Sequence, residues 1–284
     1  MILRRTVLGG LGSGLTVPTL TACAGRREAQ RLPAVARSAP PPTTAPTTPP
    51  PAVAGLDAVI DISHMVDVTD FALVRRRSNI LAVIHKASEG GDLLDPKYSL
   101  RRAEAEAVGL LWGAYHFGTR QYSGAHQASA FLAAARPGPA TLLALDLEPN
   151  DFNPRNTMEV SQAEVFVQAV HRATGRLPLI YVHPNWANGL PHAGQRLAAP
   201  ITSSSILARC DLWLGDYRDV PEVPLAWADR GWRLWQYVAN ESAADAAHGT
   251  VPRAVAGVSH CDRNLFAGDA PALYHFWNGL GRTT

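Results

Sequence analysis

The sequence is poor in cysteine, in charged residues and in long apolar runs, and each shortage excludes a class of protein. Three cysteines in 284 residues are too few for a disulfide-built scaffold, and they lack the paired spacing of a zinc site. No stretch has the 18 or more apolar residues that a permanent transmembrane helix requires. Since 46% of the residues are hydrophobic, the chain can still bury a core, which excludes wholesale disorder and a fibrous protein.

Basic residues are scarce outside the N-terminal segment. Residues 1–37 carry six arginines against one glutamate, and the remaining 20 basic and 23 acidic residues give the rest of the chain a net charge of −3. A nucleic-acid-binding domain carries a basic patch on its folded part. Nucleic acid is therefore not expected as a partner.

The first 23 residues have the pattern of an export signal. Arg4 and Arg5 precede a short, glycine-broken apolar stretch at 7–15, and paired arginines in this place resemble a twin-arginine signal. The motif L-T-A-C at 20–23 resembles a bacterial lipobox, in which cleavage before the cysteine leaves its thiol lipid-modified. We expect an exported protein that is anchored in the cell envelope through Cys23. An ordinary secretory signal with a chance cysteine is the alternative.

Residues 24–55 form a segment of unusual composition. Eight prolines lie between Pro33 and Ala54, with Thr, Ala and Ser among them and a single charge. Such a segment buries little apolar area and extends as a semi-rigid polyproline II spacer. The sequence therefore predicts a tether over residues 24–55, which lifts a domain over residues 56–284 away from a membrane surface.

Strand and helix patterns alternate from residue 56 onward. Short apolar strands are predicted at 58–62, 81–86, 111–117, 141–148, 179–182, 212–217 and 233–237, with a weaker one near 255–262. Helical patterns lie between the early strands, at 67–77, 96–108, 122–135 and 161–174. Nearly continuous Val, Ile, Leu and Ala runs are typical of a parallel sheet that is buried on both faces. This alternation predicts an α/β fold, either a TIM-barrel-like closed barrel or an open doubly wound sheet.

Polar side chains gather where the predicted strands end, which is where a barrel of this kind carries its chemistry. At least five carboxylates and several aromatic residues fall at such positions, together with one lysine and one glutamine. The residues are Asp61, Lys86, Glu89, Tyr115, Asp146, Glu148, Tyr181, Asp216, Trp235, Gln236 and Asp262. Aromatic rings offer flat apolar faces to sugars, while carboxylates bind hydroxyl groups and move protons. The pattern indicates glycoside chemistry. The ten histidines show no H-E-x-x-H pattern, so no metal or other cofactor is expected.

Asp146 and Glu148 are the most informative pair. Their i, i+2 spacing on a strand puts both side chains on one face, with Cα atoms roughly 6.6–6.8 Å apart. Repulsion and burial then favour a proton on one of the two carboxyl groups, which can protonate a glycosidic oxygen while its ionised neighbour stabilises positive charge. We expect Glu148 to hold the proton, because the apolar strand around Leu147 disfavours its charge, and Asp146 to stay ionised beside Lys86 or a tyrosine hydroxyl. A solvated Asp/Glu pair in a loop is the alternative.

Taken together, these residues resemble glycoside hydrolase family 25, the N-acetylmuramidase type of lysozyme. The resemblance is carried by D-I-S (61–63), H-K-A-S-E-G (85–90), D-P-K-Y (95–98), G-A-Y-H-F (113–117), L-A-L-D-L-E (143–148), I-Y (180–181), W-L-G-D-Y (213–217), W-Q-Y (235–237) and C-D-R-N (261–264). It implies a flattened (βα)5β3 barrel. It also implies metal-free hydrolysis of the β-1,4 bond between N-acetylmuramic acid and N-acetylglucosamine in peptidoglycan.

The resemblance further implies roles for single residues. Glu148 matches the proposed general acid and Asp146 the carboxylate that assists the substrate's acetamido group, while Asp61 is the third expected catalytic residue. The expected substrate-binding residues are Glu89, Lys86, Tyr115, Tyr181, Asp216, Trp235, Gln236 and Asp262. The chain departs from the family pattern at His64-Met65, and at Gly215, where the family usually has Ala. A non-catalytic peptidoglycan-binding lipoprotein on the same fold is the runner-up, and a periplasmic sugar-binding protein is a third reading.

Cys210 and Cys261 are the thiols that remain once Cys23 is lipidated. An oxidising compartment and an even count favour a disulfide between them, since each flanks a late strand that helices no longer brace. Two buried thiols are the alternative. The enzyme is expected to act as a monomer on peptidoglycan glycan strands.

Overall fold

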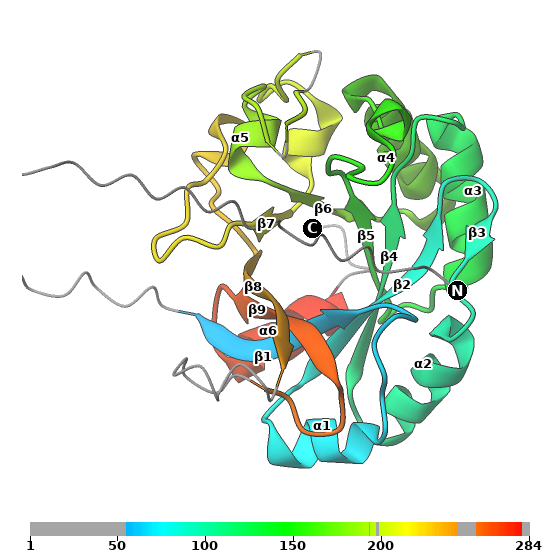
Figure 1. Cartoon of the computed structure of the whole chain (residues 1–284), viewed down its shortest axis with the longest axis vertical. Coiled ribbons are helices and arrows are strands. Elements are labelled where there is room, and N and C mark those ends of the chain that lie inside the picture. The colour runs from blue at the N-terminus through cyan, green and yellow to red at the C-terminus, as the bar shows by residue number, and fades with distance from the viewer. Residues whose placement is uncertain (1–54, 193, 197–198, 243–253, 280–284) are drawn as a thin grey trace, which may run out of the picture. The chain divides into compact units, whose positions relative to one another are not determined.

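The computed structural model describes residues 55–192, 194–196, 199–242 and 254–279 (Figure 1). Within them, one sheet closes on itself through the pairing of its first strand with its second and forms an eight-stranded barrel. The barrel strands, in chain order, are β1 (Leu56–Ile62), β2 (Ala82–Glu89), β4 (Leu111–Phe117), β5 (Leu142–Asp146), β6 (Leu179–Val182), β7 (Leu212–Gly215), β8 (Leu234–Ser242) and β9 (His260–Phe266). The two-residue β3 (Leu93–Leu94) pairs antiparallel with the end of β2, outside the barrel.

The barrel is mixed because its last strand runs against its two neighbours. All the other neighbouring strands around the barrel are parallel, whereas β9 pairs antiparallel with both β1 and β8. A parallel connection needs a crossover, while an antiparallel one needs only a turn or loop. The closing strand therefore joins the barrel without a covering helix.

Helices follow the first five parallel strands and one more ends the chain. They are α1 (Phe71–Arg77), α2 (Tyr98–Ala107), α3 (Gly124–Ala135), α4 (Val160–Thr174), the short α5 (Pro184–Ala187) and α6 (Ala270–Gly279). Figure 1 shows α2, α3 and α4 along one side of the barrel, outside β2, β4 and β5. Five βα units followed by three strands confirm the α/β fold and the (βα)5β3 order. No helix of the described residues is long and apolar enough to cross a membrane.

The amphipathic pattern of the fourth helix explains its position. Ala163, Phe166, Val167 and Val170 are its buried residues, at the i, i+3, i+4 and i+7 spacing of a single helix face. The helix begins in a capping box between Glu159 and Gln162 and ends at Gly175, whose φ of 72° lies in the left-handed region.

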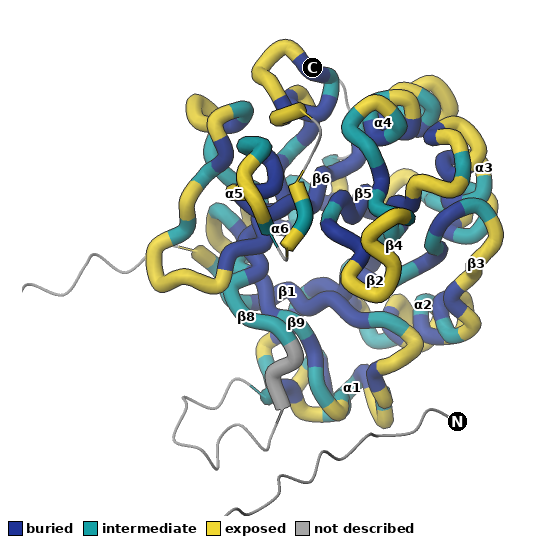
Figure 2. The backbone as a smooth tube through the Cα atoms, turned by 45° about the horizontal axis from the view of Figure 1, so that its top comes forward, coloured by how far each residue is buried: buried dark blue, intermediate teal, exposed yellow. Residues whose placement is uncertain are grey.

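Strand alternation divides the core into two layers. Side chains that point into the barrel, such as Val59, Ile84 and Ala144, form one apolar cluster, and those that point outward, such as Ile60, pack beneath the helices. Figure 2 shows that the parallel barrel strands from β1 to β7 are mostly buried, that β9 and the described part of β8 are buried only in part, and that exposed residues lie mainly on loops and outer helix faces.

Helix α6, which the sequence patterns do not predict, closes the bottom of the barrel. Its Leu273 and Trp277 belong to the inward-facing cluster, and Trp277 Nε1 donates a hydrogen bond to the backbone oxygen of Trp112 at the start of β4 (3.0 Å). Leu273 and Trp277, four positions apart on one face, are its buried residues. The helix seals the end opposite the strand C-termini, so the barrel opens only where the polar side chains lie.

The predicted disulfide between Cys210 and Cys261 is wrong. The two cysteines are buried and not joined, and the Cys210 thiol donates a weak hydrogen bond to the Ile206 carbonyl (Sγ···O 3.6 Å). Cys210 lies just before β7, at the bottom of the barrel, while Cys261 precedes Asp262, which pairs with Asp61 near the top end of β1. Both thiols flank late strands, but they lie at opposite ends of the barrel. Burial raises the pKa of Cys210 to about 12, which makes its thiol unreactive.

Trp277→Ala should lower the free energy of unfolding by about 3–5 kcal/mol, because it leaves a cavity at the bottom of the barrel and removes the bond to Trp112. Chemical denaturation monitored by circular dichroism measures this change. The matched control, His275→Ala, removes an exposed ring from the same helix and should change stability by less than about 0.5 kcal/mol. Equal effects of the two substitutions would show that α6 does not seal the core.

Candidate active site

A cleft of about 200 Å³ opens at the C-terminal ends of the parallel strands. It is lined by Asp61, Tyr115, Asp146, Glu148, Tyr181, Trp213, Tyr217, Gln236, Ala239 and Asp262. Strand alternation explains this lining, since Asp61 lies two positions after Val59 and Asp146 two positions after Ala144, on the inward face of each strand. The inward layer thus changes from apolar to acidic at the mouth. Seven residues expected from the sequence meet in this cleft.

Asp61 is held by amide groups from the last two strands. Gln236 Nε2 donates to both carboxylate oxygens of Asp61 (3.1 Å each), and Asn264 Nδ2 donates to Oδ2 (2.7 Å). Burial and the nearby Asp262 carboxylate raise the pKa of Asp61 well above its usual value, and these amide hydrogen bonds act in the opposite direction. Asn264 is a site residue that the sequence analysis did not single out, although it repeats the inward spacing of Asp262.

The side-chain amide of Gln236 has a defined orientation. Its Oε1 accepts hydrogen bonds from the Tyr181 hydroxyl (2.8 Å) and from the Tyr217 hydroxyl (2.9 Å). Its Nε2 therefore faces the carboxylates. Tyr217, another residue not singled out from the sequence, is 54% exposed and lies where a substrate ring can reach it.

Asp146 is the more deeply buried member of the central pair. Burial, followed by the Glu148 carboxylate, raises the pKa of Asp146 well above its usual value, while the charge of Lys86 acts in the opposite direction. Asp146 Oδ1 has no hydrogen-bond partner among the described residues. The expected hydrogen bond from Lys86 or a tyrosine hydroxyl to Asp146 is therefore not formed among the described residues, and Lys86 favours the ionised form of Asp146 only through its charge.

Glu148 lies beyond the strand on which it was predicted. β5 ends at Asp146, so Glu148 belongs to the following loop, and its side chain is 29% exposed. The expected burial of Glu148 by the apolar strand is therefore wrong. Its Oε2 lies 3.3 Å from Nε2 of His183, a buried residue that the sequence analysis missed. His183 follows Tyr181 at the same i, i+2 spacing, which was the available signal.

Lys86 and Glu89 lie near the mouth but do not line the cleft. Lys86 Nζ donates to Glu89 Oε2 at 2.5 Å and lies 5.1 Å from the centre of the Phe117 ring. The pairing of β2 with β4 shifts register between Lys86 and Ser88, and such a bulge changes the direction of a side chain. Lys86 therefore acts on Asp146 through its charge, without a hydrogen bond to it.

Asp216 and Trp235 also lie outside the cleft lining. The Asp216 carboxylate accepts hydrogen bonds from Arg218 (2.8 and 2.7 Å) and from the backbone of Glu222 (2.8 Å), and Trp235 Nε1 donates to the Asp216 carbonyl (2.5 Å). Although burial opposes it, the hydrogen bonds from Arg218 and the backbone keep the pKa of Asp216 below its usual value. Their contacts indicate that both residues shape the loop after β7, while their predicted role in substrate binding stays a prediction.

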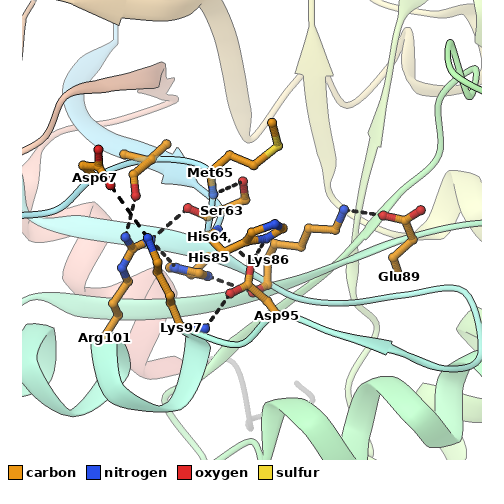
Figure 3. A network of polar contacts seen from close by, with 11 residues as sticks. Ser63, His64, Met65, Asp67, His85, Lys86, Glu89, Asp95, Lys97 and Arg101 are labelled. Atoms are coloured by element: carbon orange, nitrogen blue, oxygen red, sulfur yellow. Dashed lines mark hydrogen bonds and ion pairs between the residues drawn. The ribbon is translucent and has the colours of Figure 1, made fainter. Parts of the chain in front are cut away.

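Arg101 of α2 ties down the loop after β1 (Figure 3). Its guanidinium donates to the carbonyl oxygens of Ser63 (2.8 Å) and Val66 (2.5 Å) and to His85 Nε2 (3.1 Å). His85 Nδ1 in turn donates to the Lys86 carbonyl (2.7 Å), and burial lowers the pKa of His85 to about 4, so its ring is neutral. Arg101 thereby links the backbone that follows Asp61 to the end of β2.

The departure from the family pattern at His64 has a structural role. Asp95 accepts hydrogen bonds from the His64 backbone (2.8 Å), from His64 Nδ1 (3.0 Å) and from the Lys97 backbone (2.9 Å), as Figure 3 shows. Met65 is 74% exposed beside it. This second link fixes the loop after β1 to the start of α2.

The chemistry that this cleft supports is proton transfer between closely spaced carboxyl groups. Two carboxyl pairs, Asp61 with Asp262 and Asp146 with Glu148, line this one cleft of about 200 Å³. Within the described residues, no three His, Cys, Asp or Glu side chains are grouped to hold a metal ion. A carboxylate pair with aromatic neighbours at the mouth of an α/β barrel is the arrangement of a glycosidase.

Comparison with known proteins identifies the family. The family model for glycosyl hydrolases family 25 matches residues 60–246, and the chain belongs to this family. It is 27% identical over 229 residues to lysozyme M1 from Streptomyces globisporus. The aligned region covers 75% of this chain and 69% of the relative.

Two solved structures are similar over most of the chain. The lysozyme from Streptomyces coelicolor has a TM-score of 0.64 at 25% identity, with 80% of this chain and 99% of that chain covered. The muramidase from Acremonium alcalophilum has a TM-score of 0.60 at 28% identity, with 78% and 98% covered. The protein is a glycoside hydrolase of the lysozyme type.

Asp146→Asn should make the protein more stable at pH 7. The pKa of Asp146 is raised in the folded state. The contribution of its carboxyl group to the free energy of unfolding is therefore present at acid pH and is lost as the pH rises through that raised pKa. Asparagine does not ionise, and a gain of ~1 kcal/mol corresponds to a Tm higher by about 2–4 °C for a domain of this size. Calorimetry at pH 4 and pH 7 should show this gain only at pH 7.

The exposed Asp219 supplies the control for this experiment. Asp219→Asn also replaces a carboxylate near the cleft mouth, and it should leave the Tm unchanged at both pH values. An equal gain for Asp146→Asn at pH 4 and pH 7 would contradict the assignment of a raised pKa to Asp146.

Proposed function

We propose that this enzyme is a muramidase that hydrolyses the β-1,4 bond between N-acetylmuramic acid and N-acetylglucosamine in peptidoglycan. The observation that carries the proposal is the pair of Asp146 and Glu148, one buried and one at the edge of the cleft, in a chain of the lysozyme family. Relatives named lysozyme and muramidase, at 25–28% identity, support the same substrate.

Glu148 is the proposed general acid. Its partly exposed carboxyl at the mouth can reach a glycosidic oxygen of a bound glycan. The acid proton passes to that oxygen while the bond between the oxygen and the anomeric carbon breaks, and the leaving sugar departs as an alcohol. Glu148 is then a carboxylate, which can accept a proton from the incoming water.

Asp146 is proposed to assist the substrate's own acetamido group. The acetamido oxygen attacks the anomeric carbon while Asp146 accepts a hydrogen bond from the acetamido N–H and stabilises its positive charge, and water later opens the resulting ring. Burial and the neighbouring Glu148 carboxylate raise the pKa of Asp146, so a state in which only one of the two groups is ionised is favoured. When the proton is on Glu148, Asp146 is relieved of repulsion and can ionise.

Asp61 is proposed to stabilise the charge that develops near the anomeric carbon. Its hydrogen bonds to Gln236 and Asn264 hold the carboxyl in one orientation, so no reorganisation is needed during the reaction. Tyr115, Tyr181 and Asp262 are proposed to bind sugar hydroxyl groups from the other walls of the cleft.

Glu148→Gln should lower kcat by about 10²–10⁴-fold while binding survives, because glutamine keeps the shape but cannot donate the proton. Asp146→Asn should be similarly damaging and Asp61→Asn somewhat less so. The measurement is the release of reducing ends from purified peptidoglycan, with mass spectrometry of the fragments. The pH–rate profile should lose its alkaline limb in Glu148→Gln.

Glu104→Gln is the matched control, since it makes the same chemical change on the exposed face of α2 and should leave kcat unchanged. If Glu148→Gln digests peptidoglycan within tenfold of the parent rate, Asp61 or Asp262 becomes the better candidate acid. If the unaltered protein binds peptidoglycan but releases no reducing ends, it is a non-catalytic wall-binding protein on this fold.

We further propose that the enzyme is exported and held in the cell envelope by a lipid on Cys23. Cys23 and the tether over residues 24–55 lie almost wholly outside the described residues, so this proposal is supported by the sequence motif L-T-A-C and the proline-rich composition alone. About 30 extended residues at ~3.1 Å each reach on the order of 90 Å, which suits an enzyme whose polymeric substrate lies away from the membrane.

Cys23→Ser should move the protein from the membrane fraction to the soluble exported fraction, because serine removes the thiol that accepts the lipid. Cell fractionation with immunodetection measures the distribution. Thr21→Ser keeps a small residue and the thiol, so it should stay in the membrane fraction. Membrane association that persists in Cys23→Ser would rule out the lipid anchor.

A further inference from the structure

His183 contacts the proposed general acid and is itself fixed in one tautomer. It follows β6 on the inward face, and its Nδ1 lies 2.7 Å from the carbonyl oxygen of Gly215. Because a carbonyl can only accept, Nδ1 carries a hydrogen and donates it there. The other ring nitrogen, Nε2, then faces Glu148 Oε2 at 3.3 Å.

This contact requires one proton between the imidazole and the carboxyl group. Either a protonated Glu148 donates to the bare Nε2, or an imidazolium donates from Nε2 to the Glu148 carboxylate. We propose that His183 is a positioning residue that holds the Glu148 carboxyl and shares with it the proton that reaches the glycosidic oxygen. The inference deepens the proposed function and rests on the assignment of Glu148 as the acid.

The surroundings of His183 prevent its ring from turning. His192 stacks on one face, with ring centres 3.8 Å apart and an angle of 21° between the planes. Tyr181 and Tyr217 contact it edge-on, at 5.4 and 6.1 Å between ring centres. With Nδ1 bound to Gly215, the ring keeps Nε2 directed at the carboxyl group, so the acid proton has a defined position before substrate arrives.

Gly215 connects this arrangement to the departure from the family pattern. A Cβ atom at this position would lie 2.5 Å from Tyr181 Oη and 3.0 Å from His183 Cε1. Both rings are buried and bonded, so neither can move aside cheaply. Glycine at this position thus leaves the space that the rings of His183 and Tyr181 occupy, while its backbone carbonyl orients His183.

The titratable groups around His183 determine how the pair responds to pH. They come from several elements: Asp146 and Glu148 at the end of β5, Tyr181 on β6, Asp151 and His192 in the flanking loops, and Tyr217 after β7. A carboxyl that shares its proton with a second base keeps that proton to higher pH than the carboxyl alone. The alkaline limb of the pH–rate profile should therefore lie higher with His183 than without it.

Two substitutions distinguish the positioning of the Glu148 carboxyl by His183 from the sharing of its proton. His183→Gln can keep a hydrogen bond to Glu148 but has no titratable nitrogen, so kcat at its optimum should stay within about fivefold while the alkaline limb moves down by about one pH unit. His183→Phe keeps a ring but no hydrogen bond, so kcat should fall by about 10–100-fold with KM nearly unchanged. His275→Phe is the control, since it replaces an exposed histidine of α6 outside the cleft, and its kcat and pH profile should match the parent.

The assay uses the full chain on purified peptidoglycan from pH 4 to pH 9, with the Tm of each variant measured alongside. Folded His183→Gln and His183→Phe variants that both keep the parent kcat and alkaline limb would overturn the proposal. If His183→Phe fails to fold, His183→Gln decides it through the position of the limb. If Glu148→Gln keeps its activity, the acid assignment and this inference are both overturned. If Glu148→Gln is inactive but both His183 variants keep the parent kcat and pH profile, only this inference is overturned.

Nitrogen-15 NMR of the histidine-labelled protein gives a readout that does not depend on activity. The His183 ring should carry a proton on Nδ1 at every pH at which the protein is folded. A neutral His183 ring with its single proton on Nε2 would overturn the proposal, because Nε2 could not then accept the proton of Glu148.

Discussion

The antiparallel pairing of β9 with both β1 and β8 is the interaction on which the rest of the site depends. Its register places Asn264 opposite Gln236 on β8, and it places Asp262 opposite Asp61, which lies about 200 positions earlier in the sequence. Without this strand the barrel has two open edges, and Asp61 loses the Asn264 amide that holds its carboxyl. Closure of the fold and assembly of the acidic cleft are therefore the same event.

The burial of several carboxyl groups close together lowers the stability of this fold. Asp61 and Asp146 are buried beside other acids, and burial raises the pKa of each. Amide hydrogen bonds from Gln236 and Asn264 offset part of this cost at Asp61. Asp146 has an oxygen without a partner among the described residues, so the unfavourable burial persists where the proposed chemistry needs it.

Helix α6 and the hydrogen bonds of Arg101 show how residues outside the cleft stabilise its position and shape. α6 seals the lower end with Trp277, which leaves the upper end as the opening of the barrel interior. Arg101 fixes the loop directly after Asp61 from outside the barrel. The Gly215 carbonyl orients His183 from the neighbouring strand. The contacts of Arg101 and of the Gly215 carbonyl each restrain a residue that lies near an acidic side chain of the cleft.

The resemblance to a known family supplied the order of five βα units and three strands, whereas the sequence by itself determined the α/β fold and seven residues of the cleft. These depend on local patterns, because apolar runs define buried strands and alternation directs Asp61 or Asp146 inward. The strand limits were less certain, since propensity does not show that β5 ends at Asp146 and leaves Glu148 in a loop.

Only the tertiary structure decided which polar side chains face one another. Cys210 and Cys261 both flank late strands, yet they lie at opposite ends of the barrel because β9 runs against its neighbours. Asp216 directly follows β7, as expected for a residue of the mouth, but its carboxylate bonds to Arg218 of the following loop and does not line the cleft. The contact of His183 with Glu148 depends on a carbonyl 32 residues further along the chain, at Gly215. Such pairings follow from register and packing between distant strands, which local sequence patterns do not encode.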